Sequence, residues 1–366
     1  MFENIYKNKK VLITGNTGFK GTWLTTWLLK LGAKIVGFSK DVPTTPSAFE
    51  LLKLRDKITH YQEDIRNLDK IKLILNDERP DFIFHLAAQA IVSQSYQRPL
   101  ETLETNILGT ANILEALRSI TWPCTAILIT SDKCYENVEW CWGYKENDRL
   151  GGKDIYSASK GAAELIFHAY HHSFLPSGGK VRLATARAGN VIGGGDWAQD
   201  RIVADCFRAW SKKLPVSIRN PQATRPWQHV LEPLSGYLHL GWQLNQNIKL
   251  HGESYNFGPR AEQNQSVETL LKDLSKKWGH ENISDAYKVL EDRPFHEACL
   301  LKLNCDKALF DLKWNAAINY TETVTMVSNW YGKYYKQNAD MFACTLEQIE
   351  EYEILAQKGK VLWSQN

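Results

Sequence analysis

The sequence has no segment that marks export or membrane insertion. Its 366 residues begin with MFENIYK, which lacks the apolar run of a secretory signal peptide. The most apolar stretch, residues 82–92, is interrupted by His85 and Gln89 and is far too short to span a bilayer. We therefore expect a protein that works in the cytoplasm and has no membrane segment.

The spacing of the cysteines argues against the usual cysteine-based sites. The seven cysteines form no C-x-x-C pair, so neither a zinc site nor a disulfide framework is indicated. His168, His171 and His172 share helical spacing, but no nearby carboxylate or cysteine completes a metal site. We predict no metal, and reduced thiols at Cys124, Cys134, Cys141, Cys206, Cys299, Cys305 and Cys344.

An excess of one charge is also missing. Lys and Arg number 44 against 41 Asp and Glu, and the net charge of +3 excludes a strongly basic nucleic-acid binder. Hydrophobic residues make up 43% of the chain, which is enough to bury a sizeable core. The 13 tryptophans beside only 3 methionines are unusual, because a buried indole N–H needs a hydrogen-bond partner.

The first 190 residues alternate short apolar runs with longer amphipathic ones. Runs at residues 11–14, 35–38, 82–86 and 126–130 predict strands that are buried on both faces. Helical patterns cover about residues 18–31, 67–78, 100–119 and 154–173. This alternation predicts an α/β fold with a doubly wound parallel sheet, which binds ligands at the carboxyl ends of its strands.

A glycine-rich loop follows the first predicted strand and opens the first helix. Gly15 allows a tight turn, Gly18 lets a pyrophosphate approach closely, and Gly21 lets the helix pack on the strand. The helix N-terminus adds free N–H groups and a partial positive charge. The order Lys20-Gly21-Thr22 does not fit a P-loop. We predict a dinucleotide site here; a merely structural turn is the alternative.

Two further segments are candidates for the adenosine end of a dinucleotide. After the second strand, Ser39 and Asp41 can bond a ribose, while Lys40 would tolerate a 2′-phosphate; these residues favour NAD but leave NADP open. Asp64 and Ile65 follow the third strand, where an adenine edge would be read. A solvated turn is the alternative for this second segment.

Tyr156 and Lys160 lie four residues apart and hence on one face of a predicted helix. A lysine in that place stabilises a phenolate and can bond a nicotinamide ribose, so the tyrosine becomes a usable base. Tyr6 and Lys10 have the same spacing, but they precede the first strand. Tyr156 opens the helix after the fifth strand's long loop, over the expected nicotinamide site.

That long loop carries Ser131, Asp132 and Lys133 at the carboxyl end of its strand. Ser131 can hydrogen-bond a substrate hydroxyl or carbonyl that Tyr156 deprotonates. Asp132 and Lys133 offer an acid and a base, and burial would lower the pKa of the lysine. A surface ion pair in a turn is the alternative.

Taken together, these motifs resemble the extended short-chain dehydrogenase/reductase family over essentially the whole chain. The resemblance is carried by Gly15-x-x-Gly18-x-x-Gly21, His85-Leu-Ala-Ala-Gln, Thr105-Asn-Ile-Leu-Gly-Thr and Tyr156-x-x-x-Lys160. Longer segments resemble the CDP-glucose 4,6-dehydratases within it: GNTGFKGTWL from residue 15, and TSDKCYEN from residue 130 followed by WCWGY. The resemblance implies a Rossmann-type fold, tightly held NAD and CDP-glucose as substrate.

The resemblance also implies which residues bind the two ligands. The cofactor-binding set comprises Tyr156 and Lys160 together with Gly15, Thr17, Gly18, Phe19, Lys20, Gly21, Ser39, Asp41, Asp64, Ile65, Ala87, Ala88, Gln89 and Asn106. The substrate-binding set comprises Asn190, Arg201, Arg219, Arg225, Arg293 and His296. Arg225 and Arg293 would hold the diphosphate; surface arginines are the alternative.

Related sugar-nucleotide dehydratases carry Thr-Asp-Glu where this chain has Ser131-Asp132-Lys133. By resemblance, Tyr156 takes the O4 proton as C4 is oxidised, Lys133 in its neutral form removes the C5 proton, and Asp132 protonates the departing O6 hydroxyl. Hydride then returns to C6. Because the usual glutamate is a lysine here, the identity of the C5 base stays open.

The chain divides by pattern into a dinucleotide-binding domain at 1–190, a smaller α/β substrate lobe at 191–345 interwoven with it, and a tail at 346–366. Trp23 and Trp27 lie on a helical stripe that we expect in the core. The resemblance implies a homodimer or a dimer of dimers, no nucleic-acid partner, and a role in supplying deoxysugars for a surface polysaccharide. A GDP-mannose dehydratase, a 4-epimerase and a non-catalytic NAD-binding protein are the alternatives.

Overall fold

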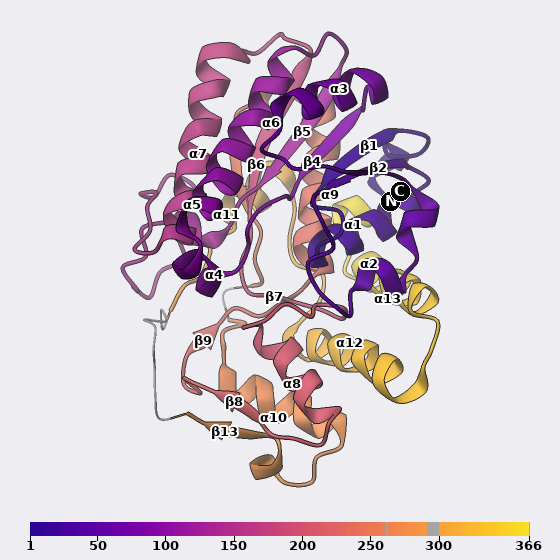
Figure 1. Cartoon of the computed structure of the whole chain (residues 1–366), viewed down its shortest axis with the longest axis vertical. Coiled ribbons are helices and arrows are strands. Elements are labelled where there is room, and N and C mark those ends of the chain that lie inside the picture. Colours follow the sequence, from indigo (N-terminus) through magenta and orange to yellow (C-terminus); the bar gives the residue numbers. More distant parts are fainter. Residues whose placement is uncertain (261, 291–299, 366) are drawn as a thin grey trace.

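The computed structural model describes residues 1–260, 262–290 and 300–365 of the chain (Figure 1). Arg293 and His296, which are predicted to bind substrate, lie outside the described residues. Figure 1 shows a larger lobe that contains the main sheet and, below it, a smaller lobe. Within the described ranges, no helix combines the length and the apolar character needed to cross a bilayer.

The larger lobe is built on a seven-stranded sheet in which every pairing is parallel. The strands lie in the order β11-β6-β5-β4-β1-β2-β3. The chain adds strands on one side of β1 up to β3 and then on the other side from β4, so the switch point of the doubly wound fold lies between β1 and β4. The predicted α/β, Rossmann-type architecture is therefore confirmed. The strands are β1 (Lys10–Thr14), β2 (Lys34–Ser39), β3 (Thr59–Gln62), β4 (Phe82–His85), β5 (Cys124–Ile129), β6 (Val181–Arg187) and β11 (Ser254–Asn256).

Alternate side chains of the strands point to opposite faces, and each face has its own helices. Leu12 and Leu128 pack with the helices α3 (Leu68–Glu78), α6 (Gly109–Arg118) and α7 (Ile155–Phe174). Ile13 and Ile127 pack with α1 (Phe19–Lys30) and α9 (Leu231–Gln246). Burial of both faces explains why the strands are almost continuously apolar in the sequence.

The smaller lobe contains three two-stranded pairings, β10 with β7, β12 with β9 and β13 with β8. Its elements are β7 (Val191–Ile192), α8 (Ile202–Trp210), β8 (Val216–Ile218), β9 (Thr224–Arg225), β10 (Gln228–His229), β12 (Gln265–Ser266), α10 (Val267–Trp278), β13 (Tyr287–Val289) and α12 (Tyr320–Gly332). Between these segments the chain returns to the larger lobe to form α9 and β11. The two lobes are therefore interwoven.

Shorter elements connect the others. They are η1 (Phe2–Asn4), α2 (Ala48–Leu51), η2 (Leu54–Lys57), α4 (Val92–Gln97), α5 (Pro99–Leu103), η3 (Glu104–Leu108), η4 (Asp132–Cys134), η5 (Ile248–Leu250), η6 (Ile283–Asp285), α11 (Asp306–Leu312), η7 (Lys333–Gln337) and η8 (Leu362–Ser364). Of these, η3 is a π-helical turn between α5 and α6, a form often found at functional sites.

The C-terminal segment is part of the core of the larger lobe. Helix α13 (Met341–Lys358) packs against α1, and Nε1 of Trp27 donates a hydrogen bond to Glu353 at 2.8 Å. Trp363 stacks on Phe2, with ring centroids 5.0 Å apart, and on Tyr352 at 5.7 Å. The two ends of the chain therefore lie side by side (Figure 1).

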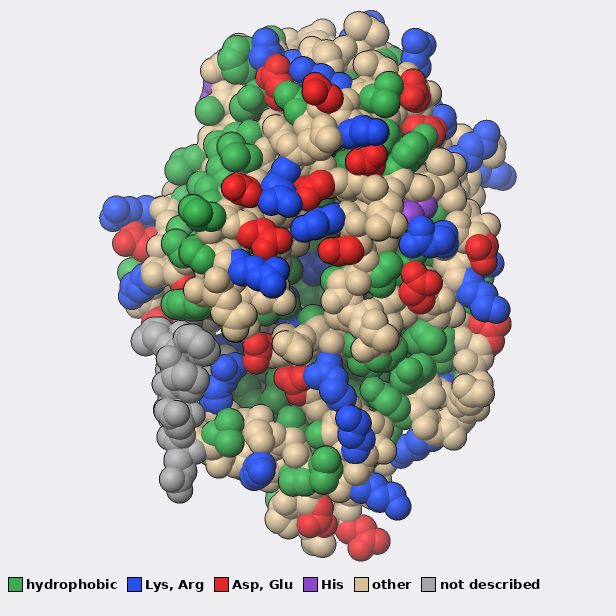
Figure 2. Space-filling model, in the orientation of Figure 1, with side chains coloured by type: hydrophobic (Ala, Val, Ile, Leu, Met, Phe, Trp, Pro, Cys, Tyr) green, Lys and Arg blue, Asp and Glu red, His purple; other side chains and the backbone are tan. Residues whose placement is uncertain are grey.

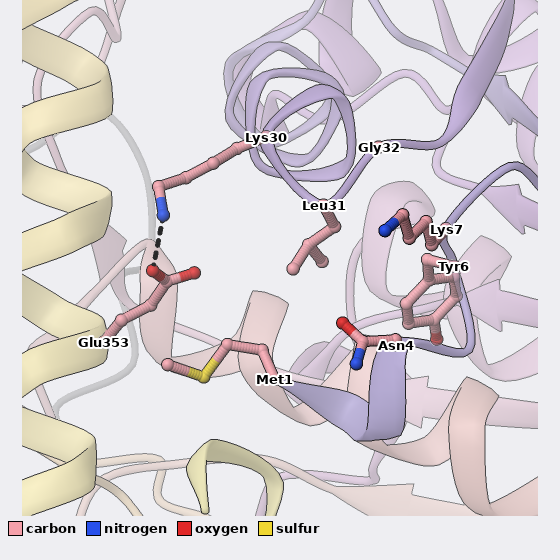
Figure 3. Close-up of a pocket in the computed structure, with 8 residues that line it drawn as sticks. All are labelled: Met1, Asn4, Tyr6, Lys7, Lys30, Leu31, Gly32 and Glu353. Atoms are coloured by element: carbon pink, nitrogen blue, oxygen red, sulfur yellow. Dashed lines mark hydrogen bonds and ion pairs between the residues drawn. The ribbon is translucent and has the colours of Figure 1, made fainter. Parts of the chain in front are cut away.

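A pocket of about 300 Å³ lies near the place where the two ends of the chain meet, at the carboxyl end of α1 (Figure 3). An ion pair of 2.7 Å between Lys30 and Glu353 spans α1 and α13 there. The other lining residues are Met1, Asn4, Tyr6, Lys7, Leu31 and Gly32. The predicted ligand loop precedes the opposite end of α1, so this pocket belongs to a different part of the molecule.

Most tryptophans are packed in the fold's interior, and this explains the unusually high tryptophan content of the sequence. Trp23 and Trp27, predicted to be core residues, are 1% and 0% exposed. Nε1 of Trp23 donates to the carbonyl of Gly194 at 2.8 Å and so ties α1 to the start of the smaller lobe. A second aromatic cluster within that lobe contains Trp197, Phe207, Trp210, Trp278, Trp330 and Tyr331.

We predict that Trp363→Ala lowers the free energy of unfolding by about 3–5 kcal/mol, because it removes a buried ring from the cluster that joins the chain ends. Urea denaturation followed by circular dichroism measures the change. Leu362→Ala is the matched control, since its side chain is 39% exposed and its loss should cost far less. Equal losses in the two variants would contradict the assigned role of Trp363.

Candidate active site

The loop between β1 and α1 has the shape of a phosphate cradle. Gly15 has a φ of +74°, and a Cβ there would lie 2.8 Å from the backbone nitrogen of Ala87. A Cβ on Gly21 would lie 2.1 Å from the carbonyl oxygen of Gly15, so only glycine fits at either position. A Cβ on Gly18 would meet nothing closer than 3.4 Å, so packing within the protein does not require this glycine. The remaining explanation for a glycine at position 18 is the close approach of a ligand.

Side chains at the end of β2 hold this loop in place. The Thr17 hydroxyl donates to the carbonyl of Asp41 at 2.7 Å, and the Ser39 hydroxyl donates to Oδ1 of the buried Asn16 at 2.7 Å. The Asp41 carboxylate is exposed. The predicted residues Thr17, Ser39 and Asp41 therefore gather beside the cradle, whereas Asn16 was missed by the sequence analysis.

Asp64 and Ile65 follow β3 at the same edge of the sheet. Arg66 holds the Asp64 carboxylate in place, with Nη2 at 2.7 Å and its backbone N–H at 2.9 Å. The hydrogen bond from Arg66 lowers the pKa of Asp64 against the opposing effect of burial. Ile65 is 4% exposed and packs against Gly109 of α6.

Ala87, Ala88 and Gln89 follow β4 and form the next part of the edge. Asn106, in the π-helical turn η3, accepts from the backbone N–H of Gln89 at 2.8 Å and donates to Oγ of Ser159 at 2.9 Å. Asn106 is 2% exposed, so it fastens this loop to α7 from inside. The role of Ser159 was not predicted, because its partner is 53 residues away in the sequence.

The catalytic candidates gather where β5 ends. The Ser131 hydroxyl caps the turn η4 by accepting from the N–H of Lys133 at 3.2 Å, and donates to Oδ1 of Asp132 at 3.0 Å. Asp132 is 4% exposed, and its carboxylate lies against Gly189, where any Cβ would collide with it. Lys133 is only partly buried. In this turn the Asp132 carboxylate therefore lies inside the site, and the Lys133 amine lies at its margin.

Tyr156 and Lys160 face this turn from the first part of α7. Tyr156 is 7% exposed and hydrogen-bonded to Ser131. Burial raises the pKa of Tyr156, while the charge of Arg201 and the bond to Ser131 oppose the rise. Burial also lowers the pKa of Lys160 to about 8. Ser131 is therefore joined to Tyr156, and Lys160 lies one turn further along the same face of α7.

A buried ion pair lies directly beneath this group. Glu164, one turn after Lys160 on α7, binds the Arg187 guanidinium of β6 through two bonds of 3.0 and 2.9 Å. Thr130, the residue before Ser131, donates to Glu164 Oε1 at 2.5 Å, and Thr185 donates to Oε2 at 2.9 Å. Glu164 thereby fastens the catalytic turn, the catalytic helix and β6 to one another.

The predicted substrate-binding residues that the structure describes lie on the side of the smaller lobe. Asn190 has a φ of +53° and points its amide at Asp132 Oδ2, 3.5 Å away. Arg201 donates to the carbonyl of Ala90 at 3.2 Å, which bridges the two lobes. Arg225 lies in β9 and Arg219 follows β8. Figure 2 shows a hollow between the lobes with Lys and Arg side chains around it.

Lys20, which the resemblance assigns to the cofactor, has a contact that the sequence analysis missed. Lys20, from the first turn of α1, donates to the hydroxyl of Tyr237 on α9 at 3.3 Å. The charges of Asp132 and Lys160 both act on the Lys20 ammonium. Tyr237 has no recognisable motif around it, so no sequence signal could have found it.

Metal-binding chemistry has no support among residues 1–260, 262–290 and 300–365. In these ranges no three His, Cys, Asp or Glu side chains are arranged to hold an ion. The six cysteines within them are free thiols, of which Cys124, Cys134, Cys206 and Cys344 are buried.

The fold and this site define a dinucleotide-binding α/β protein with a serine–tyrosine–lysine group at the sheet edge. The sequence model of the family described as GDP-mannose 4,6 dehydratase matches residues 12–327. The chain therefore belongs to this dehydratase family. It is 43% identical over 356 residues to the CDP-glucose 4,6-dehydratase of Salmonella typhimurium, across 96% of this chain and 98% of that protein.

Solved structures share the same fold. An epimerase from Methanothermobacter thermautotrophicus superposes with a TM-score of 0.80 at 20% identity, covering 92% of this chain and 96% of its own. A dTDP-glucose 4,6-dehydratase from Streptomyces venezuelae, crystallised with NAD, gives a TM-score of 0.76 at 18% identity and covers 90% and 100%. At such identities the likeness concerns the fold alone.

We predict that Glu164→Gln lowers the free energy of unfolding by about 3–5 kcal/mol, because it leaves the Arg187 guanidinium buried without a counter-charge. Burial raises the pKa of Glu164, but Arg187 outweighs it and brings the value to about 2. The pair's contribution is thus complete above the carboxyl's ordinary pKa of about 4.5 and is lost as the pH falls toward 2. Urea denaturation at several pH values tests this.

Glu115→Gln is the matched control, since it breaks a half-exposed pair with Arg118 and should cost about 0–1 kcal/mol. A Glu164→Gln protein as stable as this control at neutral pH would show that the buried pair does not hold the site together.

Proposed function

We propose that the protein catalyses the NAD-dependent dehydration of CDP-D-glucose to CDP-4-dehydro-6-deoxy-D-glucose. The observation that carries the proposal is the full-length identity of 43% to a CDP-glucose 4,6-dehydratase, together with the gathering of Ser131, Asp132, Tyr156 and Lys160 at one sheet edge. In the proposed domain organisation, residues 1–190 bind the cofactor and the interwoven lobe at 191–345 binds the substrate. The tail at 346–366 contributes to stability.

The residues present fit NAD. The cradle at Gly15–Gly21 leaves room over Gly18, and the free N–H groups at the start of α1 suit a pyrophosphate. Ser39, Asp41, Asp64 and Ile65 would line the adenosine end, while Lys160 would bond the nicotinamide ribose. NAD bound in this way would supply hydride-transfer chemistry at the sugar.

Side chains of the protein accept and donate the protons of this reaction. Tyr156, with its pKa raised by burial, needs the ammonium of Lys160 and the Ser131 hydroxyl to accept the O4 proton as a phenolate. The new 4-ketone makes the C5 proton acidic. Lys133 is the proposed base for that proton, and Asp132, 4% exposed, is the proposed acid for the departing O6 hydroxyl.

Arginines would hold the substrate's diphosphate, because their forked geometry matches phosphate oxygens. Arg225 is the candidate within the described residues, and the proposed substrate-binding set also includes Arg293 and His296. Asn190 would contact the sugar or the diphosphate, and Arg201 and Arg219 would approach the nucleoside. A 4-epimerase needs no acid–base pair to expel water, so the Asp132–Lys133 turn favours a dehydratase.

The assembly that we propose is a homodimer, or a dimer of dimers, in the cytoplasm, where NAD and nucleotide sugars are made. Its support is an apolar surface on α5, η3 and α7, where Leu100, Leu108 and Leu165 are 72%, 56% and 60% exposed. Figure 2 shows hydrophobic side chains gathered on this flank of the larger lobe. The 4-dehydro-6-deoxy sugar would serve surface polysaccharide synthesis, such as lipopolysaccharide O-antigen.

We predict that the purified protein converts CDP-glucose, without added reductant, to a product with the strong ultraviolet absorbance that 4-keto-6-deoxy sugars show in alkali. Tyr156→Phe should reduce the rate by about 10²-fold or more, because it removes the O4 base. Parallel assays use dTDP-, UDP- and GDP-sugars. Product from one of these but not from CDP-glucose would overturn the proposed substrate.

A further inference from the structure

Two hydrogen bonds join the lobes directly across the cleft. Ser93, in α4 of the larger lobe, donates to Oδ2 of Asp200 at 2.5 Å. Nη2 of Arg201, the residue before α8 of the smaller lobe, donates to the carbonyl of Ala90 at 3.2 Å. The partners are 107 and 111 positions apart in the sequence, so the contacts depend on how the lobes lie together. Figure 1 shows α4 at the edge of the larger lobe that faces the smaller one.

These two bonds lie beside both halves of the candidate active site. On one side, Ala90 directly follows the Ala87–Gln89 loop of the predicted cofactor edge. On the other, Asp200 comes ten residues after Asn190, whose amide points at Oδ2 of Asp132. The bonds therefore span the cleft between the cofactor side and the substrate side, where Figure 2 shows the hollow between the lobes.

The segment of the smaller lobe that makes these contacts is a short tip between two fixed points. Before it, Trp197 is 4% exposed, and its Nε1 donates to the hydroxyl of Tyr335 at 3.0 Å. After it, α8 begins and packs its apolar face into the lobe. Residues 199–201 between these points are exposed. The tip can therefore move without unpacking the core of the smaller lobe.

The contacts of this tip suit a segment that opens and closes. Both hydrogen bonds to the larger lobe are exposed, so water competes for their donors and acceptors and each bond is easily exchanged. Asp200 also has a φ of +59°, in the left-handed region where residues other than glycine are strained. The closed arrangement is thus maintained by weak bonds, and it carries some backbone strain.

We propose that residues 198–201 form a latch, which closes the cleft over the nucleotide sugar through the bonds to Ser93 and Ala90. The latch opens to admit the ligand and closes again once it is bound, which keeps water away during the reaction. This inference rests on the proposed function for the identity of the ligand. The opening of the latch does not depend on which nucleotide sugar binds.

Latch opening is tested first without any ligand, by the rate at which trypsin cleaves after Arg201. Ser93→Ala removes the donor to Asp200, so the open form should gain population and cleavage should become about three- to tenfold faster. Gln94→Ala, which changes an exposed neighbour in α4, is the matched control and should leave the rate unchanged. Equal rates of cleavage in the wild type and Ser93→Ala would overturn the proposal.

The effect on ligand entry is tested with CDP as the probe, in stopped-flow binding experiments. Ser93→Ala and Asp200→Ala should each raise the association and the dissociation rate about three- to tenfold and leave Kd nearly unchanged. The double variant should add nothing further, because both substitutions remove the same bond. Glu281→Ala, which removes an exposed carboxylate of the smaller lobe, is the control for charge and should behave as the wild type.

Direct contact of these side chains with the ligand gives a different result. Kd would then weaken in each variant while the association rate stays the same, and the effects of the two substitutions would add. This outcome overturns the latch.

A reversible lock gives the converse test. Ser93→Cys combined with Asp200→Cys places two thiols where the side chains now touch, and intact mass shows whether oxidation joins them. The joined protein should lose rapid association of CDP and regain it on reduction; equally rapid association in both states would overturn the proposal. Ser93→Cys alone, oxidised in the same way, controls for the exposed thiol of Cys141. If the thiols do not join, the alanine variants decide.

The proposed function and the latch fail in distinguishable ways. Failure of the wild type to bind CDP and to act on CDP-glucose would refute the proposed function. The cleavage rates after Arg201 would still decide whether the bond between Ser93 and Asp200 holds the tip closed.

Discussion

The buried ion pair between Glu164 and Arg187 is the interaction on which the active site depends. Two charges at 0% exposure are tolerated only because each is fully hydrogen-bonded, Glu164 by Arg187, Thr130 and Thr185. Since Thr130 precedes Ser131 and Glu164 follows Lys160 by one turn, the pair sets the distance between the catalytic turn and the catalytic helix. The catalytic groups are therefore positioned by contacts within the core of the sheet.

The parallel sheet brings the remaining groups to this place. The strands β1, β2, β4 and β5 all end at one edge, so the glycine cradle, Ser39, the Ala87–Gln89 loop and Ser131 converge there although they are far apart in the sequence. The interwoven smaller lobe closes the opposite side with Asn190 and Arg201. Tryptophans such as Trp23 and Trp27 supply rigidity, because their rings fill the core and their N–H groups join separate segments.

Much of this arrangement could be predicted from local patterns. The strands, the helix that carries Tyr156 and Lys160, and the cradle at Gly15–Gly21 have periodicity or spacing that a short window contains. Tyr237, the Glu164–Arg187 pair and the inward reach of Lys20 have no such signal, because each depends on contacts between distant segments. The resemblance assigned Lys20 to the cofactor; its hydrogen bond to Tyr237, 217 positions away, has no signal in the sequence.

The proposed reaction is an internal oxidation and reduction coupled to loss of water, and the fate of the hydrogen at C4 tests it most directly. CDP-glucose carrying deuterium at C4 should yield a 4-keto sugar with that deuterium at C6, with no net consumption of NAD. Deuterium recovered at C4 of a sugar that has kept its oxygen at C6 would identify an epimerase. Deuterium released to solvent or accumulated in the cofactor would contradict the internal transfer altogether.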